Sequence, residues 1–452
     1  MTDVLVVGAG PAGMSAAIEL QRRGLTVAVA DDQPAPGGRI FAAIETRQPH
    51  GAEDRTGAAL VARFRSHGGR YLPGAEVWGI EPGPRVFLTQ AGRASMLEPR
   101  FILLATGSQE RPLPFPGWQL PGVMTIGGAQ ILMKTARQIP DEPVWLAGTG
   151  PLLLLYATQL LAAGGQIAGI LDMGSKGSRI SAARFLPGAL EYGWRDMLRG
   201  FGWMARLRRL PTVRNVTAIE AVGTDRLTGV RYKTRRGGSG EILTNQLLVH
   251  DGVIPAIHGT LAAACEHRWN PVQRCFEPVL DPLCASSVPA IFVAGDGATI
   301  AGARAAALAG RLAAIGIARA AGKLSGDDAN AEAVPLRRSV AAAARFRRFI
   351  DTLYPPAGMP IPDTTMVCRC EEVTARDIRE ALKGRPQLGP DGAKIATRAG
   401  MGPCQGRQCG LSLTRLVAEM HGGKPEEIGF LRVRPPLKPL TLGELAALET
   451  VS

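Results

Sequence analysis

The sequence is poor in cysteine over most of its length, because none of its seven cysteines precedes residue 265. A small secreted domain needs a dense disulfide framework, so that class is excluded and a reducing cytosol is the expected compartment. Enzymes that exchange thiols and disulfides through a cysteine pair near the first strand–helix unit or in a second domain are excluded by the same absence.

Other absences narrow the function further. Aromatic residues make up only 5% of the chain, which argues against a stacking platform for single-stranded nucleic acid. Neither a G-x-S-x-G nucleophile motif nor an H-E-x-x-H metal motif is present, and the six histidines are scattered. No catalytic residue is therefore assigned.

No hydrophobic run is long enough to be read as a membrane span. Residues 144–171 contain no charge, but Gly148, Gly150, Pro151 and three later glycines interrupt them. A strand–helix–strand unit explains this pattern, so no integral membrane span is expected. Met1-Thr2-Asp3 lacks the positive charge that opens a secretory signal. We expect a cytosolic protein, or one at the periphery of the inner membrane face.

The composition is that of a globular protein with a basic surface. A length of 452 residues corresponds to two or three domains, and 46% hydrophobic with 20% charged residues excludes a mainly disordered chain. The net charge of +13 is spread along the chain in short runs. This distribution indicates a solvated surface, and no nucleic-acid partner is expected.

The first segment carries a dinucleotide-binding pattern. A buried strand is predicted over 4–7, a helix over 14–23 and a second strand over 27–30. Gly8-Ala9-Gly10-Pro11-Ala12-Gly13 lies between the first strand and the helix, and the second strand ends in Asp31-Asp32. A glycine motif in this context is specific for a Rossmann-like dinucleotide site.

Each residue type in this motif has a physical task. Gly8 permits the tight turn, Gly10 lets the backbone approach a pyrophosphate, and Gly13 lets the helix pack against the strand. The helix N-terminus turns its positive dipole end towards the phosphates. Asp31 lies 18 residues after Gly13 and can accept hydrogen bonds from ribose hydroxyls. The predicted cofactor contacts in this segment are Gly8, Gly10, Pro11, Ala12, Gly13, Asp31 and Asp32.

Two further strands favour FAD over NAD at this site. Residues 101–104 form a predicted strand that ends in Ala105-Thr106-Gly107, and residues 290–294 form another that ends in Gly295-Asp296. Both patterns resemble those of the two-dinucleotide flavoprotein reductases, in which the Gly-Asp carboxylate meets the ribityl or pyrophosphate part of FAD. The resemblance implies this role for Asp296, which can also cap a helix predicted over 298–320.

A second, degenerate glycine motif follows a strand predicted over 144–147. Gly148 and Gly150 occupy the first two glycine positions, but Leu153 replaces the third, so the helix must stand farther from its strand. The next strand, over 166–171, ends at Asp172. Such a site can hold NAD(P), or an adenine nucleotide without turnover. A unit that only maintains the fold is the alternative.

The last four cysteines form a metal-binding pattern, with C-x-C at Cys368 and Cys370 and C-x4-C at Cys404 and Cys409. Four thiolates can hold either Zn²⁺ or an iron–sulfur cluster. Zinc ribbons usually use two C-x2-C turns, so these spacings favour a [2Fe–2S] cluster over zinc. Three nearby cations would offset the negative charge of the cluster: Lys394, Arg398 and Arg407.

These motifs predict an α/β flavoprotein with two dinucleotide-binding domains and a small C-terminal [2Fe–2S] domain. The expected order is an FAD-binding domain (1–115 and 245–325), an inserted second nucleotide-binding, NAD(P)-like domain (116–244), a helical linker (326–365), the [2Fe–2S] domain (366–425) and a Pro-rich arm (426–452). The arm is expected to dock on this chain or on a partner subunit.

A family resemblance agrees with this division. Residues 366–373 and 398–407 resemble the bacterioferritin-associated-ferredoxin-like [2Fe–2S] domain. They resemble most the form fused to the flavoprotein α-type subunits of opine oxidase, hydrogen cyanide synthase and heteromeric proline or hydroxyproline dehydrogenases. Residues 105–123, Gly37-Gly38-Arg39-Ile40 and the tail Arg434-Pro435-Pro436-Leu437-Lys438-Pro439 match the same family. The resemblance adds these expected cofactor contacts: Gly38, Arg39, Ala105, Thr106, Gly107 and Gly295.

The resemblance implies an electron-transferring subunit of a hetero-oligomer. A partner subunit of the amino-acid-oxidase type would oxidise an opine, a proline derivative or glycine. Electrons would pass through the FAD and [2Fe–2S] centres of this chain to a quinone or similar acceptor. Two alternatives stay open: a self-sufficient NAD(P)H-dependent flavin reductase, and a zinc-bearing, non-enzymatic assembly protein.

The remaining candidate groups have structural interpretations. Cys265, Cys275 and Cys284 are unevenly spaced and are predicted to be buried, inert thiols. His258 and His267 are predicted to be satisfied structural histidines. His250-Asp251-Gly252 departs from the family pattern, since a Gly-aromatic-Gly step is expected there beside the flavin.

Overall fold

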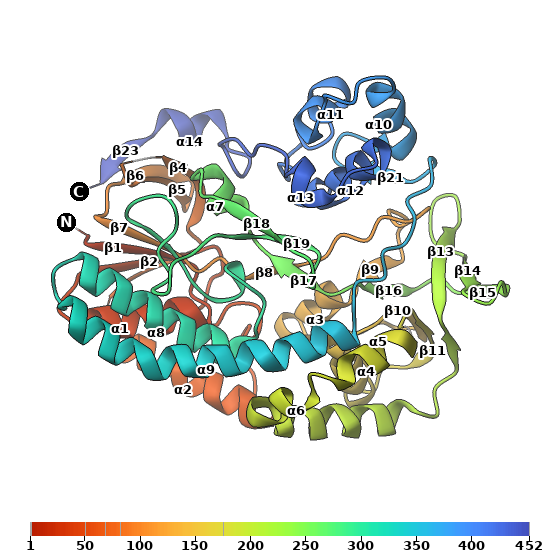
Figure 1. The fold of residues 1–452 in the computed structure, drawn as a ribbon, viewed down its shortest axis with the longest axis horizontal. Helices are drawn as coiled ribbons and strands as arrows, with labels where there is room; N and C mark the ends of the chain where they lie inside the picture. Colours follow the sequence, from red (N-terminus) through yellow and green to blue (C-terminus); the bar gives the residue numbers. More distant parts are fainter. Residues whose placement is uncertain (1, 50, 68, 82, 175, 452) are drawn as a thin grey trace.

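Two five-stranded sheets form the body of the protein (Figure 1). The structure is a computed structural model that describes residues 2–49, 51–67, 69–81, 83–174 and 176–451. The strand order is β20-β7-β1-β2-β3 in the first sheet and β12-β11-β10-β16-β9 in the second. All neighbouring strands within these two sheets run parallel.

The first sheet is covered on both faces, which explains why its strands are short apolar runs. Helices cover one face, and an antiparallel β-meander covers the other. The strands of the sheet are β1 (Val4–Val7), β2 (Val27–Asp31), β3 (Arg70–Pro73), β7 (Phe101–Leu104) and β20 (Ile291–Val293). The covering elements are α1 (Pro11–Arg22), α2 (Gly51–Ser66), α8 (Ala303–Ala320), β4 (Glu76–Glu81), β5 (Arg85–Gln90) and β6 (Arg93–Leu97).

The second sheet repeats this plan. Helices α3 (Ile126–Thr135) and α4 (Pro151–Ala162) pack on one face, and a three-stranded antiparallel sheet packs on the other. The strands of the main sheet are β9 (Val123–Thr125), β10 (Val144–Gly148), β11 (Ile167–Asp172), β12 (Thr212–Arg214) and β16 (Leu247–His250). The remaining elements of this second domain are α5 (Lys176–Ala183), α6 (Leu186–Leu207), β13 (Val216–Val222), β14 (Gly229–Thr234) and β15 (Ser239–Leu243).

The chain crosses between the two domains along paired strands. β8 (Ser108–Glu110) runs out of the first domain and β17 (Val253–Pro255) runs back, and the two pair antiparallel. β16 pairs with β10 and β9, so it belongs to the second sheet. The boundary expected between residues 244 and 245 therefore falls before a strand of the second domain. Strand order within a sheet is a tertiary property, which local sequence did not reveal.

The linker expected over 326–365 is mostly one long helix, α9 (Gly326–Leu353). Its first half contributes Ala329, Ala333 and Leu336 to the core of the first domain. Its second half places Phe349 against α5 and α6 of the second domain. α9 therefore braces the two domains, as Figure 1 shows.

The C-terminal domain forms a separate small core above the junction of the two larger domains (Figure 1). Its elements are β21 (Met366–Cys368), β22 (Val373–Thr374), α10 (Ala375–Leu382), α11 (Pro390–Thr397), α12 (Gly410–His421) and α13 (Pro425–Ile428). Leu431, Val433 and Leu437 are buried in the same core, so the first part of the expected arm belongs to this domain.

The rest of the arm docks on this chain. α14 (Leu442–Ala446) follows the Pro-rich segment, and β23 (Glu449–Val451) pairs with β6 at the edge of the meander in the first domain. The hairpin of β18 (His267–Asn270) and β19 (Cys275–Pro278) and the short helix α7 (His258–Ala262) lie between the first and the C-terminal domains.

The strands predicted from apolar runs are confirmed, with ends shifted by at most one residue for β1, β2, β7, β10 and β11. The helix predicted over 298–320 instead begins at Ala303, after the 3-10 turn Gly295–Gly297 and a loop that Asp296 holds. Within the described residues, no helix combines the length and the apolar character needed to cross a bilayer.

Candidate functional site

The predicted cofactor residues of the first domain converge at the carboxyl ends of β1, β7 and β20. A Cβ atom on Gly8 would collide with the carbonyl oxygen of Ala105, and one on Gly13 would collide with the carbonyl oxygen of Gly8. The glycine loop therefore sits directly against the turn that follows β7. Gly37 donates its N–H to the carbonyl of Ala9 at 2.9 Å, which brings Gly38 and Arg39 to the same edge.

The two acids after β2 have different tasks. Asp31 is buried, and its carboxylate accepts the N–H groups of Ala9 and, at 2.8 Å, of Gln33. Burial raises the pKa of Asp31, an effect that these N–H groups partly offset. Asp32 is exposed and accepts side-chain hydrogen bonds from Gln33 at 2.9 Å and Lys438 at 3.3 Å. Asp31 thus holds the glycine loop in place, while Asp32 is exposed at the end of β2. The edge of the sheet at the carboxyl ends of β2, β1, β7 and β20 is called the first groove below.

Asp296 holds the turn after β20, on the opposite side of β7 and β1 from β2. Its Oδ1 accepts the N–H groups of Ala301 at 2.9 Å and Gly302 at 3.0 Å, just before α8 begins. Gly295 precedes it, and a Cβ there would lie 2.8 Å from the Cβ of Ala12. Asp296 therefore closes a loop beside the glycine motif instead of serving as the N-cap itself.

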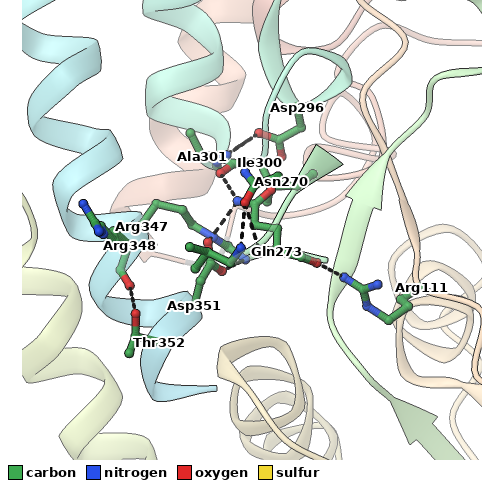
Figure 2. A network of polar contacts seen from close by, with 12 residues as sticks. Arg111, Asn270, Gln273, Asp296, Ile300, Ala301, Arg347, Arg348, Asp351 and Thr352 are labelled. Atoms are coloured by element: carbon green, nitrogen blue, oxygen red, sulfur yellow. Dashed lines mark hydrogen bonds and ion pairs between the residues drawn. The ribbon is translucent and has the colours of Figure 1, made fainter. Parts of the chain in front are cut away.

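A buried polar network fixes this turn to the rest of the molecule (Figure 2). Gln273 donates to the carbonyl oxygen of Ile300 at 3.2 Å and to Asp351 of α9 at 2.9 Å. Arg111, which follows β8, donates to the carbonyl oxygens of Gln273 and Asp251. The network joins the Asp296 loop, the domain crossing and the bracing helix. No local sequence pattern predicted this network, because its residues come from distant parts of the chain.

The second glycine loop is closed in comparison with the first. Gly148 and Gly150 are buried, and Leu153 packs in the helix-side core of the second sheet at the third glycine position. His250 ends β16 beside β10, where the strand order reverses and α/β sheets usually bind their ligand. Its Nδ1 lies 2.8 Å from Oε1 of Glu110, and its Nε2 would lie 3.9 Å from a Cβ on Gly150. An imidazole–carboxylate pair therefore lies beside this loop.

The four cysteines expected to bind metal meet as two pairs. Cys368 and Cys409 are each 1% exposed and share a hydrogen bond, while Cys370 contacts Cys404 near the surface. The hydrogen bond from Cys409 and the N–H of Gly400 lower the pKa of Cys368 to about 6. Within the described residues, no three Cys, His, Asp or Glu side chains are close enough together to hold a single metal ion.

The backbone around the thiols is shaped for an anionic group. Gly402 packs against Cys370, because a Cβ there would collide with the Cβ of Cys370. Cys409 is the N-cap of the 12-residue helix α12, and its hydrogen bond to Cys368 together with burial raises the pKa of Cys409 above the ordinary range. Of the three expected counter-cations, Arg398 is paired with Glu371 at 2.7 Å, and Lys394 donates to the carbonyl of Arg432 at 2.9 Å.

The C-x4-C loop rests directly on the first domain. Gln109 of β8, two residues after Gly107, donates to the carbonyl oxygen of Arg407 at 3.0 Å. His258 of α7 contacts the carbonyl oxygen of Gln405 at 3.2 Å. A small pocket at this junction is lined by residues of both domains, among them Ile257, His258, Arg407, Leu411 and Phe430. The cysteine loop and the turn after β7 are thus joined through one strand.

The thiols and histidines given structural interpretations behave as predicted. Cys265, Cys275 and Cys284 are buried, and burial raises the pKa of both Cys275 and Cys284 to about 12. Burial lowers the pKa of His258 and of His267 to about 4, and Nε2 of His267 lies 2.8 Å from the hydroxyl of Thr260. None of these groups is poised for chemistry at neutral pH.

Comparison with known proteins places the chain in a family. Residues 2–311 match the family described as pyridine nucleotide-disulphide oxidoreductase, and residues 363–449 match the sarcosine oxidase A3 domain. An opine oxidase subunit of Rhizobium meliloti is 42% identical over 463 residues, which cover 99% of this chain and 87% of that protein. The chain belongs to the family of opine oxidase subunits.

Two further proteins match nearly the whole length of this chain. Hydrogen cyanide synthase subunit HcnB of Pseudomonas aeruginosa is 32% identical, and the match covers 99% of this chain and 98% of that protein. The crystal structure of L-proline dehydrogenase from P. horikoshii matches with a TM-score of 0.73 at 21% identity, covering 98% of this chain and 79% of that one. At this identity the structural match supports the fold alone, and it extends over all three domains.

Proposed function

We propose that this chain is the FAD- and [2Fe–2S]-bearing subunit of a heteromeric enzyme that oxidises an amine or amino acid. The observation that carries the proposal is the contact between the cysteine loop and the first domain. The loop holding Cys404 and Cys409 is hydrogen-bonded to Gln109 on the strand that leaves the first nucleotide groove. This contact supports electron transfer between a flavin in the first domain and a cluster on the four cysteines.

The first groove fits FAD. Its glycine loop leaves no room for side chains at Gly8 or Gly13, and α1 begins within this loop, at Pro11. Backbone N–H groups and the helix dipole suit a pyrophosphate, and the exposed carboxylate of Asp32 suits ribose hydroxyls. The turn that holds Asp296 packs against the residues after β7, where the flavin half would extend. When bound, FAD supplies hydride and single-electron chemistry that amino-acid side chains lack.

The cysteine pairs fit a two-iron cluster better than a zinc ion. In a [2Fe–2S] cluster each iron is held by two thiolates, whereas structural zinc needs four ligands around one point. The pairing of Cys368 with Cys409 and of Cys370 with Cys404 matches the first arrangement. A zinc-bearing assembly protein is the alternative that metal analysis would detect.

The relatives supply the expected reaction. They are named as subunits of an opine oxidase and of a hydrogen cyanide synthase, so a second subunit completes each of those enzymes. We propose a partner of the amino-acid-oxidase type that removes two electrons from a C–N bond and passes them to this chain. A quinone or a similar acceptor would take them onward. The sequence offers no catalytic base at the first groove, which agrees with a substrate site in the partner.

The second glycine loop does not favour a self-sufficient NAD(P)H reductase. Gly148 and Gly150 are buried, Leu153 stands in the third glycine position, and the His250–Glu110 pair lies beside the loop. We propose that this domain keeps the fold and does not deliver hydride. Anaerobic mixing with NADH and with NADPH tests this directly: rapid bleaching of the flavin would overturn it, and no bleaching over minutes is expected.

The proposed function is tested by reconstitution with the partner subunit. Under anaerobic conditions the complex should bleach its flavin bands when an opine, a proline derivative or glycine is added. This chain alone should show no change with the same compounds. Full-rate amine oxidation by this chain without a partner would contradict the proposal.

A further inference from the structure

The Pro-rich motif at the C-terminal end connects the cysteine-bearing domain to the nucleotide groove. We call residues 434–439 the strap. It leaves the small core after Val433, buries Leu437, and reaches β4 of the first domain. The proposed function assigns no task to this motif.

One strap residue contacts both domains at once. The N–H of Leu437 donates to the carbonyl oxygen of Trp78 in β4 at 2.7 Å. Its carbonyl oxygen accepts a hydrogen bond from the guanidinium of Arg407 at 3.0 Å. Arg407 lies within the C-x4-C loop, so a single residue bridges the cysteine loop and the meander that covers the first sheet.

The next residue reaches the groove itself. Nζ of Lys438 lies 3.3 Å from Oδ2 of Asp32 and 3.4 Å from Oε1 of Glu76. Its side chain is only 21% exposed, so the ammonium is held between the two carboxylates. Asp32 binds side chains, Gln33 and Lys438, whereas Asp31 at the end of β2 binds backbone N–H groups.

The charges around Asp32 point to a phosphate-bearing ligand. Arg39 and Lys438 favour the charged form of Asp32, and Asp32 in turn favours the charged form of Arg407. These three cations balance the charges of three neighbouring acids, Asp31, Asp32 and Glu76, so the phosphates of a dinucleotide would meet cations here without net repulsion. A ribose that binds Asp32 would carry its phosphates close to these cations.

We infer that the strap forms the outer wall of the nucleotide groove at its adenosine end, with Lys438 as a nucleotide-binding residue. The inference rests on the proposed function for the identity of the dinucleotide. Because the strap also holds Arg407, nucleotide binding and docking of the cysteine-bearing domain stabilise one another. Coupling between two binding events is reciprocal, so each must strengthen the other by the same factor.

The test compares Lys438→Met with the wild-type protein and with Lys323→Met. The Met side chain keeps the apolar stem but removes the charge, and Lys323 is an exposed lysine just after α8. Flavin-free full-length protein is titrated with FAD and, in parallel, with ADP, which carries only the adenosine end. We expect Lys438→Met to weaken both ligands roughly 5-fold or more, and Lys323→Met to leave them unchanged.

Two further readouts separate a binding role from a structural one. Lys438→Arg keeps the charge and should restore binding. Backbone hydrogen exchange of residues 430–440 should slow when either ligand is added to the wild type, and less so in Lys438→Met. The affinity gap between the wild type and Lys438→Met should narrow at high salt, because exposed charge interactions are screened.

Each negative result has a distinct meaning. Wild-type protein that binds ADP but not FAD would contradict the proposed function and leave the strap supported. Lys438→Met that binds both ligands as the wild type does, with exchange of the strap unaffected by ligand, would overturn the inference. A strap that is protected equally with and without ligand would also overturn it.

Discussion

At the residue level, the packing around Gly13 determines whether the first groove can form. Gly13 has no space for a methyl group, since a Cβ would overlap the carbonyl oxygen of Gly8. The glycine pattern assigned this residue to close packing of helix and strand, and the structure confirms that packing. The sequence analysis assigned the ribose hydroxyls to Asp31, but in the structure both carboxylate oxygens of Asp31 accept backbone N–H groups, from Ala9 and Gln33. Such backbone contacts arise only in the folded chain.

Gly13→Ala should therefore destabilise the first domain and abolish FAD retention. Forcing a methyl group into a close-packed contact costs about 1–3 kcal/mol, and here the neighbour is backbone. Gly200→Ala in α6 is the matched control, because a Cβ there meets nothing within 4 Å. Denaturant unfolding and the flavin-to-protein ratio measure both effects. Equal behaviour of the two variants would contradict the packing argument.

Cys409→Ser should remove the cluster. Cys409 is buried beside Cys368 at the N-terminus of α12, and a serine hydroxyl is a poor ligand for iron. Cys275→Ala is the control, since Cys275 is an equally buried thiol in the first domain. Iron and sulfide analysis after anaerobic purification should show loss in the first variant alone. Retention of both irons in Cys409→Ser would remove this cysteine from the ligand set.

His267 should make the protein less stable in mild acid. Burial lowers its pKa to about 4 in the folded state, from about 6.5 when unfolded. The unfolded chain therefore binds the proton more tightly, so stability is complete above pH 6.5 and falls as the pH drops towards 4. The loss reaches up to about 3 kcal/mol. Denaturant unfolding of the wild type and His267→Gln across this range should show a shallower pH slope in the variant.

At the level of elements, the sequence predicted the individual strands better than the loops and contacts that join elements. Buried parallel strands are apolar runs, so β1, β2, β7 and β10 were predictable from local pattern. The later start of α8 depends on Asp296 binding the N–H groups of Ala301 and Gly302. Contacts of that kind form only when the folded chain brings the residues together. The contact of Lys438 in the strap with Asp32 is a second example.

The bracing helix α9 depends on its buried polar network. Asp351→Ala leaves Nε2 of Gln273 and the guanidinium of Arg347 without their shared carboxylate. Loss of buried hydrogen-bond partners costs about 1–3 kcal/mol. Thr352→Ala, which removes one hydroxyl bond to the Arg348 carbonyl, is the neighbouring control. If both variants unfold at the same denaturant concentration, the network does not brace the domains.

At the level of the whole molecule, we propose that the partner subunit binds at α6. Exposed apolar residues recur every three or four positions along this helix, which lies at the edge of the molecule opposite the C-terminal domain (Figure 1). They are Leu186, Leu190, Trp194, Leu198, Phe201 and Met204. Residues 176–210 carry eight Lys and Arg but only two acidic residues, so a second copy of this face would be repelled. A partner with an acidic rim around an apolar groove fits it better.

Leu198→Ser combined with Phe201→Ser should therefore reduce assembly with the partner subunit. These side chains are 60% and 58% exposed, so folding should not change. Leu243→Ser is the control, since Leu243 is 85% exposed on β15 and lies outside the stripe. Co-purification from cells producing both subunits is the measurement. Undiminished assembly of the double variant would place the interface elsewhere.

The central claim is that one chain holds a flavin and a two-iron cluster joined through a single strand. Anaerobic purification followed by the visible spectrum with flavin, iron, sulfide and zinc analysis tests it most directly. The account predicts flavin bands, broad absorption towards the red, and about two irons and two sulfides per chain. Flavin with zinc and no sulfide would show that the four cysteines are structural, and the proposed electron path through them would then be wrong.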